Sequence, residues 1–192
     1  MLTRPQVQRY STESGLRDVT IAEQEVVLTF LLQLLSERGL LERLAFKGGT
    51  CLRKMFIGRQ GRLSTDLDFT GIEEHDHEDV ILDMMEAFEQ PFHGIQFAIP
   101  DESYYETQDG LSWGVNPSYD HEWNTGGSEV RLQISRRETP TLPTERRPPI
   151  GRCDAGGGGV APGDEGRRVD GATRALPWRA RPASEPWSEG RR

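Results

Sequence analysis

Two neighbouring segments of this 192-residue chain carry the side chains and glycines whose types and spacing could do chemistry. The first is Lys47-Gly48-Gly49-Thr50, which we expect to lie between a strand and a helix. The second is residues 62–69, RLSTDLDF, in which Asp66 and Asp68 are two residues apart. Side chains alternate between the two faces of a strand, so a strand here would place both aspartates and Ser64 on one face. The apolar side chains of the opposite face would be Leu63, Leu67 and Phe69.

The aspartate pair indicates a site for a divalent cation. Two carboxylates held side by side repel each other unless a cation lies between them. Because Mg²⁺ binds one or two carboxylates together with substrate phosphates, we predict Mg²⁺ as the cofactor and Asp66 and Asp68 as metal ligands and catalytic residues. Ser64 joins the predicted catalytic set because its hydroxyl can bond a phosphate oxygen. The alternative is a solvated edge strand with acidic residues.

The glycine pair indicates a phosphate-binding turn. Glycine lets the backbone approach a phosphate without an intervening Cβ, and a helix that begins there presents unpaired amide groups. We therefore predict that Lys47, Gly48, Gly49, Thr50 and Ser64 contact a nucleotide. Alone the pair is a weak signal, because many strand-to-helix turns use two glycines for geometry only. Combined with the aspartates, it predicts nucleotidyl transfer, in which the turn holds the phosphates and the bound metal activates the attacking hydroxyl.

The elements that must position these segments follow from apolar periodicity and turn residues. A capping box at Thr20 and Glu23 predicts the start of a long helix that ends at Gly39. The later helix would turn inward Val80, Ile81, Met84, Met85 and Phe88. The remaining predicted elements are a strand at 44–46, a helix at 50–57, an extended segment at 63–69, a helix at 80–88, and strands at 95–99, 111–115 and 130–135. This order predicts an α+β domain with a mixed sheet.

A change of composition divides the chain after Ile150. We predict that residues 1–150 form the folded domain and that residues 151–192 form a disordered tail. The tail is mostly Gly, Arg, Ala, Pro and acids, and its few apolar side chains follow no period, so it cannot bury enough surface to offset its ordering entropy. One interpretation is a low-complexity extension. The other, which the abrupt change favours, is an out-of-frame translation of GC-rich DNA.

Charge and hydropathy restrict the partners. The formal net charge of −8 does not indicate a broad nucleic-acid-binding surface. A local patch for phosphate or RNA is one interpretation of Arg53, Lys54, Arg59 and Arg62, and a solvated helix face is the other. No apolar run reaches the roughly 18 residues of a membrane span, no signal-peptide core is present, and the two cysteines indicate no disulfide framework. We therefore expect a cytoplasmic protein with no membrane association.

Two further groups are better explained by structure than by chemistry. His75 and His77 lie among acidic residues and would suit a transition metal, but acids just before a helix favour its N-terminus, where Asp76 can act as the cap. Aromatic residues in the later strand region could stack a base, yet packing in the core or at an edge is the expected role. They are Tyr104, Tyr105, Trp113, Tyr119 and Trp123.

The sequence FKGGTCLRKMF at 46–56, followed by RLSTDLDF at 62–69, resembles the AbiEii/AbiGii toxin family, which includes the MenT toxins. The resemblance covers roughly residues 20–138 and is strongest between residues 46 and 69. It implies a polymerase-β-like nucleotidyltransferase fold, transfer of a nucleotide from an NTP, and a separately encoded antitoxin as partner. In the MenT branch the acceptor is the 3′ end of tRNA. The residues that carry over by motif are Gly48, Gly49, Ser64, Asp66 and Asp68.

Departures from the family pattern limit the expected activity. A third carboxylate commonly lies on a later strand, where this chain has Gln133, and a neutral amide is a poorer Mg²⁺ ligand. The family's second half supplies a lysine-containing helix and an Arg-Asp-x-x-Asp motif, and the sequence after Ile150 has neither. We therefore expect little or no activity from the chain as it stands. The alternatives are an inactive remnant that binds NTP or its antitoxin, and an unrelated α+β binding module.

Overall fold

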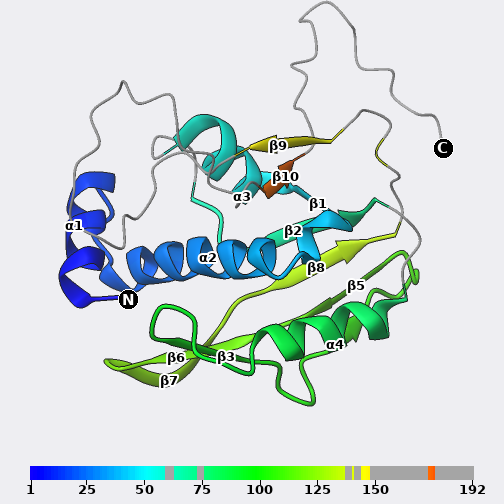
Figure 1. Ribbon diagram of the computed structural model, residues 1–192. Coiled ribbons are helices and arrows are strands. Elements are labelled where there is room, and N and C mark those ends of the chain that lie inside the picture. The colour runs from blue at the N-terminus through cyan, green and yellow to red at the C-terminus, as the bar shows by residue number, and fades with distance from the viewer. Residues whose placement is uncertain (59–62, 73–75, 137–139, 141–143, 148–172, 176–192) are drawn as a thin grey trace, which may run out of the picture.

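The computed structural model describes residues 1–58, 63–72, 76–136, 140, 144–147 and 173–175. This part of the chain contains both helices and strands, and the strands form two β-sheets (Figure 1). The predicted α+β class with a mixed sheet is therefore confirmed. Of the segment 151–192 predicted to be a tail, the structure describes only residues 173–175, and the domain boundary after Ile150 stays a prediction.

The larger sheet carries the predicted site. Its strands are β1 (Leu44–Lys47), β2 (Leu67–Gly71), β4 (Tyr105–Glu106), β5 (Ser112–Val115), β8 (Leu132–Ser135), β9 (Glu145–Arg147) and β10 (Thr173–Ala175). They lie in the order β4-β5-β8-β2-β1-β10-β9. The pairs β2–β8 and β1–β10 are parallel, and the other neighbours are antiparallel. The predicted strands at 44–46, 111–115 and 130–135 are confirmed within about two residues.

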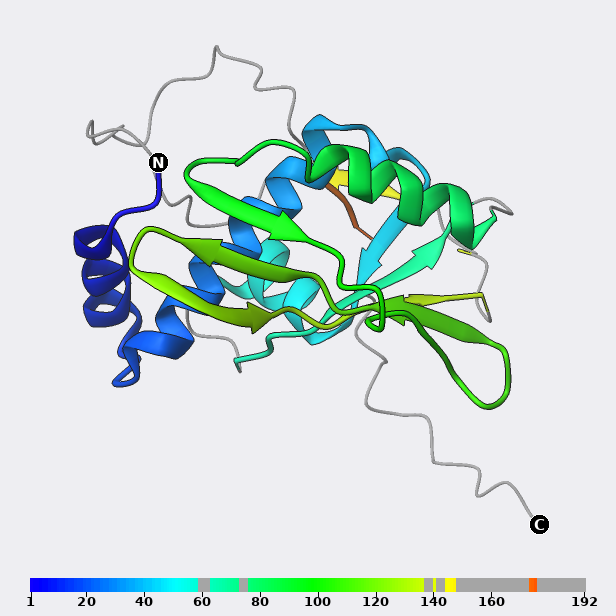
Figure 2. The same ribbon diagram turned by 90° about the horizontal axis from the view of Figure 1, so that it is seen from below.

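The smaller sheet has the order β3-β6-β7, formed by β3 (Ile95–Ala98), β6 (Ser118–His121) and β7 (Asn124–Glu129). Only β3 was predicted, because the sequence of β7, NTGGSE, has no apolar alternation. This sheet lies across the long helix when the molecule is seen from below (Figure 2).

The helical elements are α1 (Arg4–Ser14), α2 (Val19–Glu37), η1 (Leu40–Glu42), α3 (Gly48–Leu52), η2 (Arg53–Ile57) and α4 (His77–Ala87). The long helix α2 lies in the core of the domain, because most of its side chains are buried, among them Leu28, Leu31 and Leu35. By length and composition alone α2 could cross a membrane, contrary to our sequence interpretation. Its burial inside the fold is typical of a core helix.

The start of α2 corrects the predicted capping box. Asp18 is the N-cap, and its carboxylate accepts a hydrogen bond from the backbone N–H of Thr20. Glu23, expected to reach back to the helix start, is buried instead. Its Oε1 lies 3.0 Å from Nε2 of His121 and accepts a 2.6 Å hydrogen bond from Asn124, so it ties α2 to the smaller sheet. The end of the helix follows the prediction, since Gly39 adopts the left-handed conformation.

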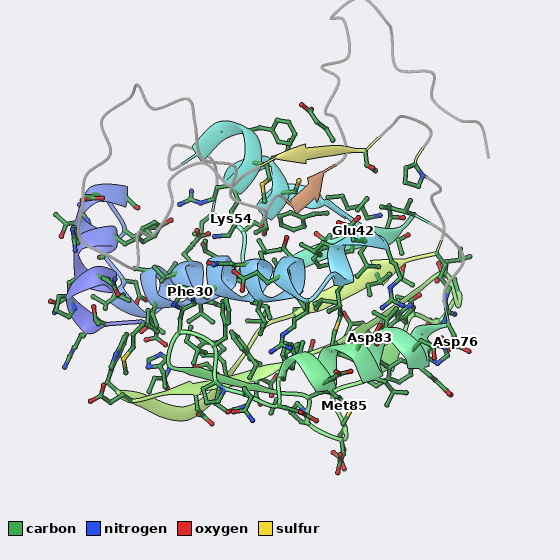
Figure 3. The ribbon with its side chains drawn as sticks, in the orientation of Figure 1. Phe30, Glu42, Lys54, Asp76, Asp83 and Met85 are labelled. Carbon is green, nitrogen blue, oxygen red and sulfur yellow. The ribbon has the colours of Figure 1, made fainter. Side chains whose placement is uncertain are left out.

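Helix α4 confirms the predicted element and corrects one of its inward positions. Asp76 caps it as expected, accepting from the N–H of Glu78. Val80 and Met84 are buried, whereas Met85 is 50% exposed and points away from the fold (Figure 3). His75 of the conceivable metal site lies outside the described residues. Among the residues that the structure describes, no group of three or more His, Cys, Asp or Glu side chains could hold a metal ion.

Arg53 and Lys54 fit neither of the two interpretations of the basic residues, a phosphate-binding patch or a solvated helix face. Both side chains are buried, and Lys54 lies between η2 and α2 (Figure 3). Arg53 Nε and Lys54 Nζ each lie 3.3 Å from a carboxylate oxygen of Glu25, which is 1% exposed. Lys54 also donates to the hydroxyl of Thr29, and Tyr10 of α1 donates to Glu25. Arg59 and Arg62 lie outside the described residues.

This cluster predicts a large destabilisation when Glu25 is removed. Glu25→Ala leaves two buried cations without their counter-charge, so we expect the free energy of unfolding to fall by about 3–5 kcal/mol. Urea denaturation followed by circular dichroism measures the change. The matched control is Glu37→Ala on the same helix, which removes an exposed hydrogen bond from Gln33 and a charge near His93 and should cost less than about 1 kcal/mol. Comparable losses in the two variants would contradict the assignment of Glu25 to a buried pair.

Candidate active site

The register of the larger sheet brings the predicted segments into one polar row. Lys47 of β1 pairs with Asp68 of β2, and Asp68 pairs in turn with Gln133 of β8. The neighbouring row points to the opposite side, where Phe46 and Phe69 are fully buried and their rings pack with centroids 5.2 Å apart. The alternation along β1 and β2 therefore separates an apolar face, which holds the sheet to the core, from a polar face, which carries the candidate site.

The glycine turn packs directly against the aspartates. Gly48 begins α3 in the left-handed conformation, with φ of 79°. A Cβ at this position would collide with Oδ2 of Asp68 and lie 3.1 Å from its Cβ and Cγ. Two demands therefore require glycine here, the positive φ and the close approach of the Asp68 carboxylate.

The next two residues of the turn contact the segment before β2. A Cβ at Gly49 would lie 3.2 Å from Oγ of Ser64, so this hydroxyl also lies against bare backbone. Thr50 is buried, and its hydroxyl donates a 2.6 Å hydrogen bond to the carbonyl oxygen of Asp66. Thr50 thus fixes the backbone that carries Asp66, while its predicted contact with a nucleotide stays a prediction.

One detail of the acidic segment differs from our expectation. The strand begins at Leu67, so residues 63–66 precede it and only Asp68 lies within β2. Asp66 is exposed, and Asp68 is half-buried. Leu67 and Phe69 occupy the apolar face as predicted.

The electrostatics of Asp68 suit a cation site. Burial raises the pKa of Asp68 above its usual value, the Asp66 carboxylate raises it further, and the charges of Lys47 and Arg131 lower it in part. A carboxylate that is partly desolvated beside a second carboxylate gains from a positive charge between them. The donor set fits Mg²⁺, which takes one or two protein carboxylates and completes its shell with water and phosphate oxygens.

A polar cavity of about 320 Å³ opens beside this row. Lys47, Asp68 and Gln133 line it, together with residues of the β4–β5 connection. Gln133 therefore occupies the position beside Asp68 where we expected an acid. The other lining residues are Phe69, Thr107, Asp109, Ser112 and Ser135.

The structure thus links every predicted site residue through pairing or contact. It adds Arg131, which we missed, and Tyr105, for which we expected only packing. Arg131 lies one residue before β8, and its backbone carbonyl accepts a hydrogen bond from the N–H of Leu67, between the two aspartates. Tyr105 of β4 contacts the Arg131 guanidinium. The alternation Arg131-x-Gln133 was visible in the sequence, but its place beside Asp66-x-Asp68 depends on the pairing of β2 with β8.

Comparison with known proteins shows the family of this chain. The sequence profile described as nucleotidyl transferase AbiEii toxin, Type IV TA system, matches residues 29–161. The chain belongs to this AbiEii family. The fold is similar to that of MenT4, a nucleotidyltransferase toxin from Mycobacterium tuberculosis, with a TM-score of 0.59 and 30% sequence identity over 79% of this chain and 49% of MenT4. No curated protein sequence matches.

A nucleotidyltransferase described as putative, from H. pylori, is 21% identical over 60% of this chain and 47% of its own length, with a TM-score of 0.41. This AbiEii chain therefore spans about half the length of the solved structures that it matches. The nucleotidyltransferase fold expected from the sequence is confirmed by the family and by the likeness to MenT4.

The contact between Gly48 and Asp68 predicts that a single methyl group at Gly48 will disturb the AbiEii site. We expect Gly48→Ala to lower the free energy of unfolding by about 2–4 kcal/mol, because of backbone strain and crowding against Asp68. The displacement of Asp68 should also weaken the binding of Mn²⁺, used as the test cation in place of Mg²⁺. Gly15→Ala is the matched control, since Gly15 has a similar φ of 66° but no atom within 4 Å of an added Cβ. It should cost only the backbone strain of about 1–2 kcal/mol. Equal losses in both variants, with Mn²⁺ binding intact, would refute a special role for Gly48.

Proposed function

We propose that this chain forms the nucleotide- and metal-binding part of a toxin that transfers a nucleotide from an NTP to an acceptor, the 3′ end of tRNA. The observation that carries the proposal is the convergence of the Gly48-Gly49 turn on Ser64 and Asp68. Membership of the AbiEii family supports nucleotidyl transfer as the reaction. The MenT resemblance supports tRNA as the acceptor, and the toxin family supports a cognate antitoxin as partner and a cytoplasmic location.

Each residue has a distinct role in this proposal. Asp66 and Asp68 hold Mg²⁺, which, when bound, activates the attacking hydroxyl and stabilises the leaving pyrophosphate. The bare backbone at Gly48 and Gly49 admits the NTP phosphates close to the carboxylates. Lys47, paired with Asp68 across the sheet, supplies positive charge at the cavity wall. The Ser64 hydroxyl, which lies against Gly49, bonds a phosphate oxygen.

A second candidate function is binding without transfer, either of NTP or of the antitoxin. The observation that favours it is the amide of Gln133 beside Asp68, where a carboxylate would complete a stronger metal site. We expect this amide to lower the rate of transfer while leaving the glycine turn and the aspartate pair in place.

The test of function is Mg²⁺-dependent labelling of tRNA by each of the four labelled NTPs, using the full chain. We expect any transfer to fall at least about 100-fold in Asp66→Asn and Asp68→Asn, because the metal loses a charged ligand while the shape of the site is kept. The matched control is Asp101→Asn, an exposed acid outside the cavity, which should leave the rate unchanged.

Calorimetric titration with the same NTPs separates the two candidates. NTP binding that requires both aspartates but gives no labelled tRNA identifies the non-catalytic form. Transfer that survives both substitutions would refute the assignment of the catalytic metal to this pair. A chain that binds no NTP would exclude both candidates that depend on nucleotide.

A further inference from the structure

Arg131 is held beside the aspartate pair by two side chains. Its Nε donates a 3.3 Å hydrogen bond to the hydroxyl of Tyr105, and its Nη2 donates to Oε1 of Gln133 at 3.5 Å. The guanidinium carbon also lies 5.7 Å from the centroid of the Tyr105 ring, within the range of a cation–π contact. Arg131 is exposed, yet these contacts give its side chain a defined orientation.

The position of Tyr105 depends on a glycine of the neighbouring strand. Tyr105 pairs with Gly114 of β5, and a Cβ at Gly114 would lie 2.6 Å from Cζ of the Tyr105 ring. A Cβ there would also collide with the carbonyl oxygen of Leu132. Because Gly114 has no side chain, the Tyr105 ring can lie across β5. Its hydroxyl then contacts Leu132 at the start of β8 and Arg131, the residue before it.

The charge of Arg131 acts on Asp68, but no ion pair with a described carboxylate neutralises it. Arg131 and Lys47 are the cations that lower the pKa of Asp68, and among the described residues no carboxylate forms an ion pair with Arg131. A guanidinium has five N–H donors, and the bonds to Tyr105 and Gln133 use two of them. The remaining donors form a planar fork, a geometry that matches the oxygens of a phosphate group.

We propose that Arg131, oriented by Tyr105 and Gln133, binds a phosphate group of the substrate beside the Asp66–Asp68 pair. This inference rests on the proposed function and adds a second cation, besides Lys47, to the predicted residues. It also gives Gln133 a role of its own. A neutral amide accepts a hydrogen bond from Arg131 without neutralising it, whereas a carboxylate in that position would compete with the phosphate for the guanidinium.

The first test compares phosphate binding by Arg131 variants of the full chain. Calorimetric titration with each Mg²⁺-NTP, and with a short single-stranded RNA, distinguishes the NTP phosphates from those of the acceptor strand. We expect Arg131→Gln to weaken binding of one of these ligands about 10- to 100-fold, the range for a lost hydrogen bond to a charged group. Arg131→Lys should keep part of the affinity, because it keeps the charge but not the fork. Tyr105→Phe should cost about threefold, because only one orienting bond is lost.

Arg136→Gln is the matched control. Arg136 follows the same strand, but its guanidinium is bonded to Glu106 and lies 3.1 Å from His77, so its loss should change neither affinity by more than about twofold. Urea unfolding midpoints that agree between Arg131→Gln and Arg136→Gln exclude a folding defect as the cause.

Gln133→Glu gives the decisive arm. The proposal expects weaker phosphate binding, because the new carboxylate pairs with Arg131. Stronger NTP binding or faster transfer in Gln133→Glu would instead identify Gln133 as a weakened metal ligand and overturn the inference.

Two further outcomes separate this inference from the function on which it rests. Unchanged affinity for both ligands in Arg131→Gln, with NTP binding still lost in Asp66→Asn, would overturn the inference and leave the proposed function standing. A wild-type chain that binds neither ligand would overturn both.

Discussion

The site depends on one close approach, that of the Asp68 carboxylate to the bare backbone of Gly48. The antiparallel register of β1 and β2 sets Lys47 opposite Asp68, and the turn that follows must then pass directly over the acidic side chain. The buried contact between Phe46 and Phe69 on the other face holds the two strands in that register. A slip of one residue would exchange the two faces, and it would bury the acids while exposing the aromatic rings.

The turn is also fixed from behind, by the helical segment that it opens. Arg53 and Lys54 of η2 share the buried carboxylate of Glu25 in α2, and Thr50 bonds the backbone of Asp66. Desolvation offsets much of the attraction within a buried ion pair, so such a cluster fixes the position of η2 more than it adds net stability. The helical segment that follows the glycine turn is thereby joined to the core helix α2 on one side and to the acidic segment on the other.

The sequence was informative wherever a local rule decides the structure. Period-two alternation put Asp68 and Phe69 on opposite faces, and glycine chemistry marked the turn. It failed where the outcome depends on a partner distant in the chain. Nothing in the local sequence indicates that Lys54 is buried in an ion pair with Glu25. Arg131 lies beside the aspartates only because the strands have the order β4-β5-β8-β2. The cap of α2 was misplaced for a different reason, since Asp18 and Thr20 are both good capping residues and only the backbone decides between them.

The parallel pairing of β2 with β8 sets an order of assembly. The glycine turn and the aspartates come from one short stretch, whereas the residues that pair with β2 from β8 follow 65 positions later. Closing so long a loop costs chain entropy before the new contacts compensate, so this pairing is slow compared with the docking of β1 on β2. A chain leaving the ribosome from its N-terminus therefore brings the acids and the turn together first. It completes the polar row only when β8 has been synthesised and has docked, so a half-translated chain carries the two carboxylates without the guanidinium beside them.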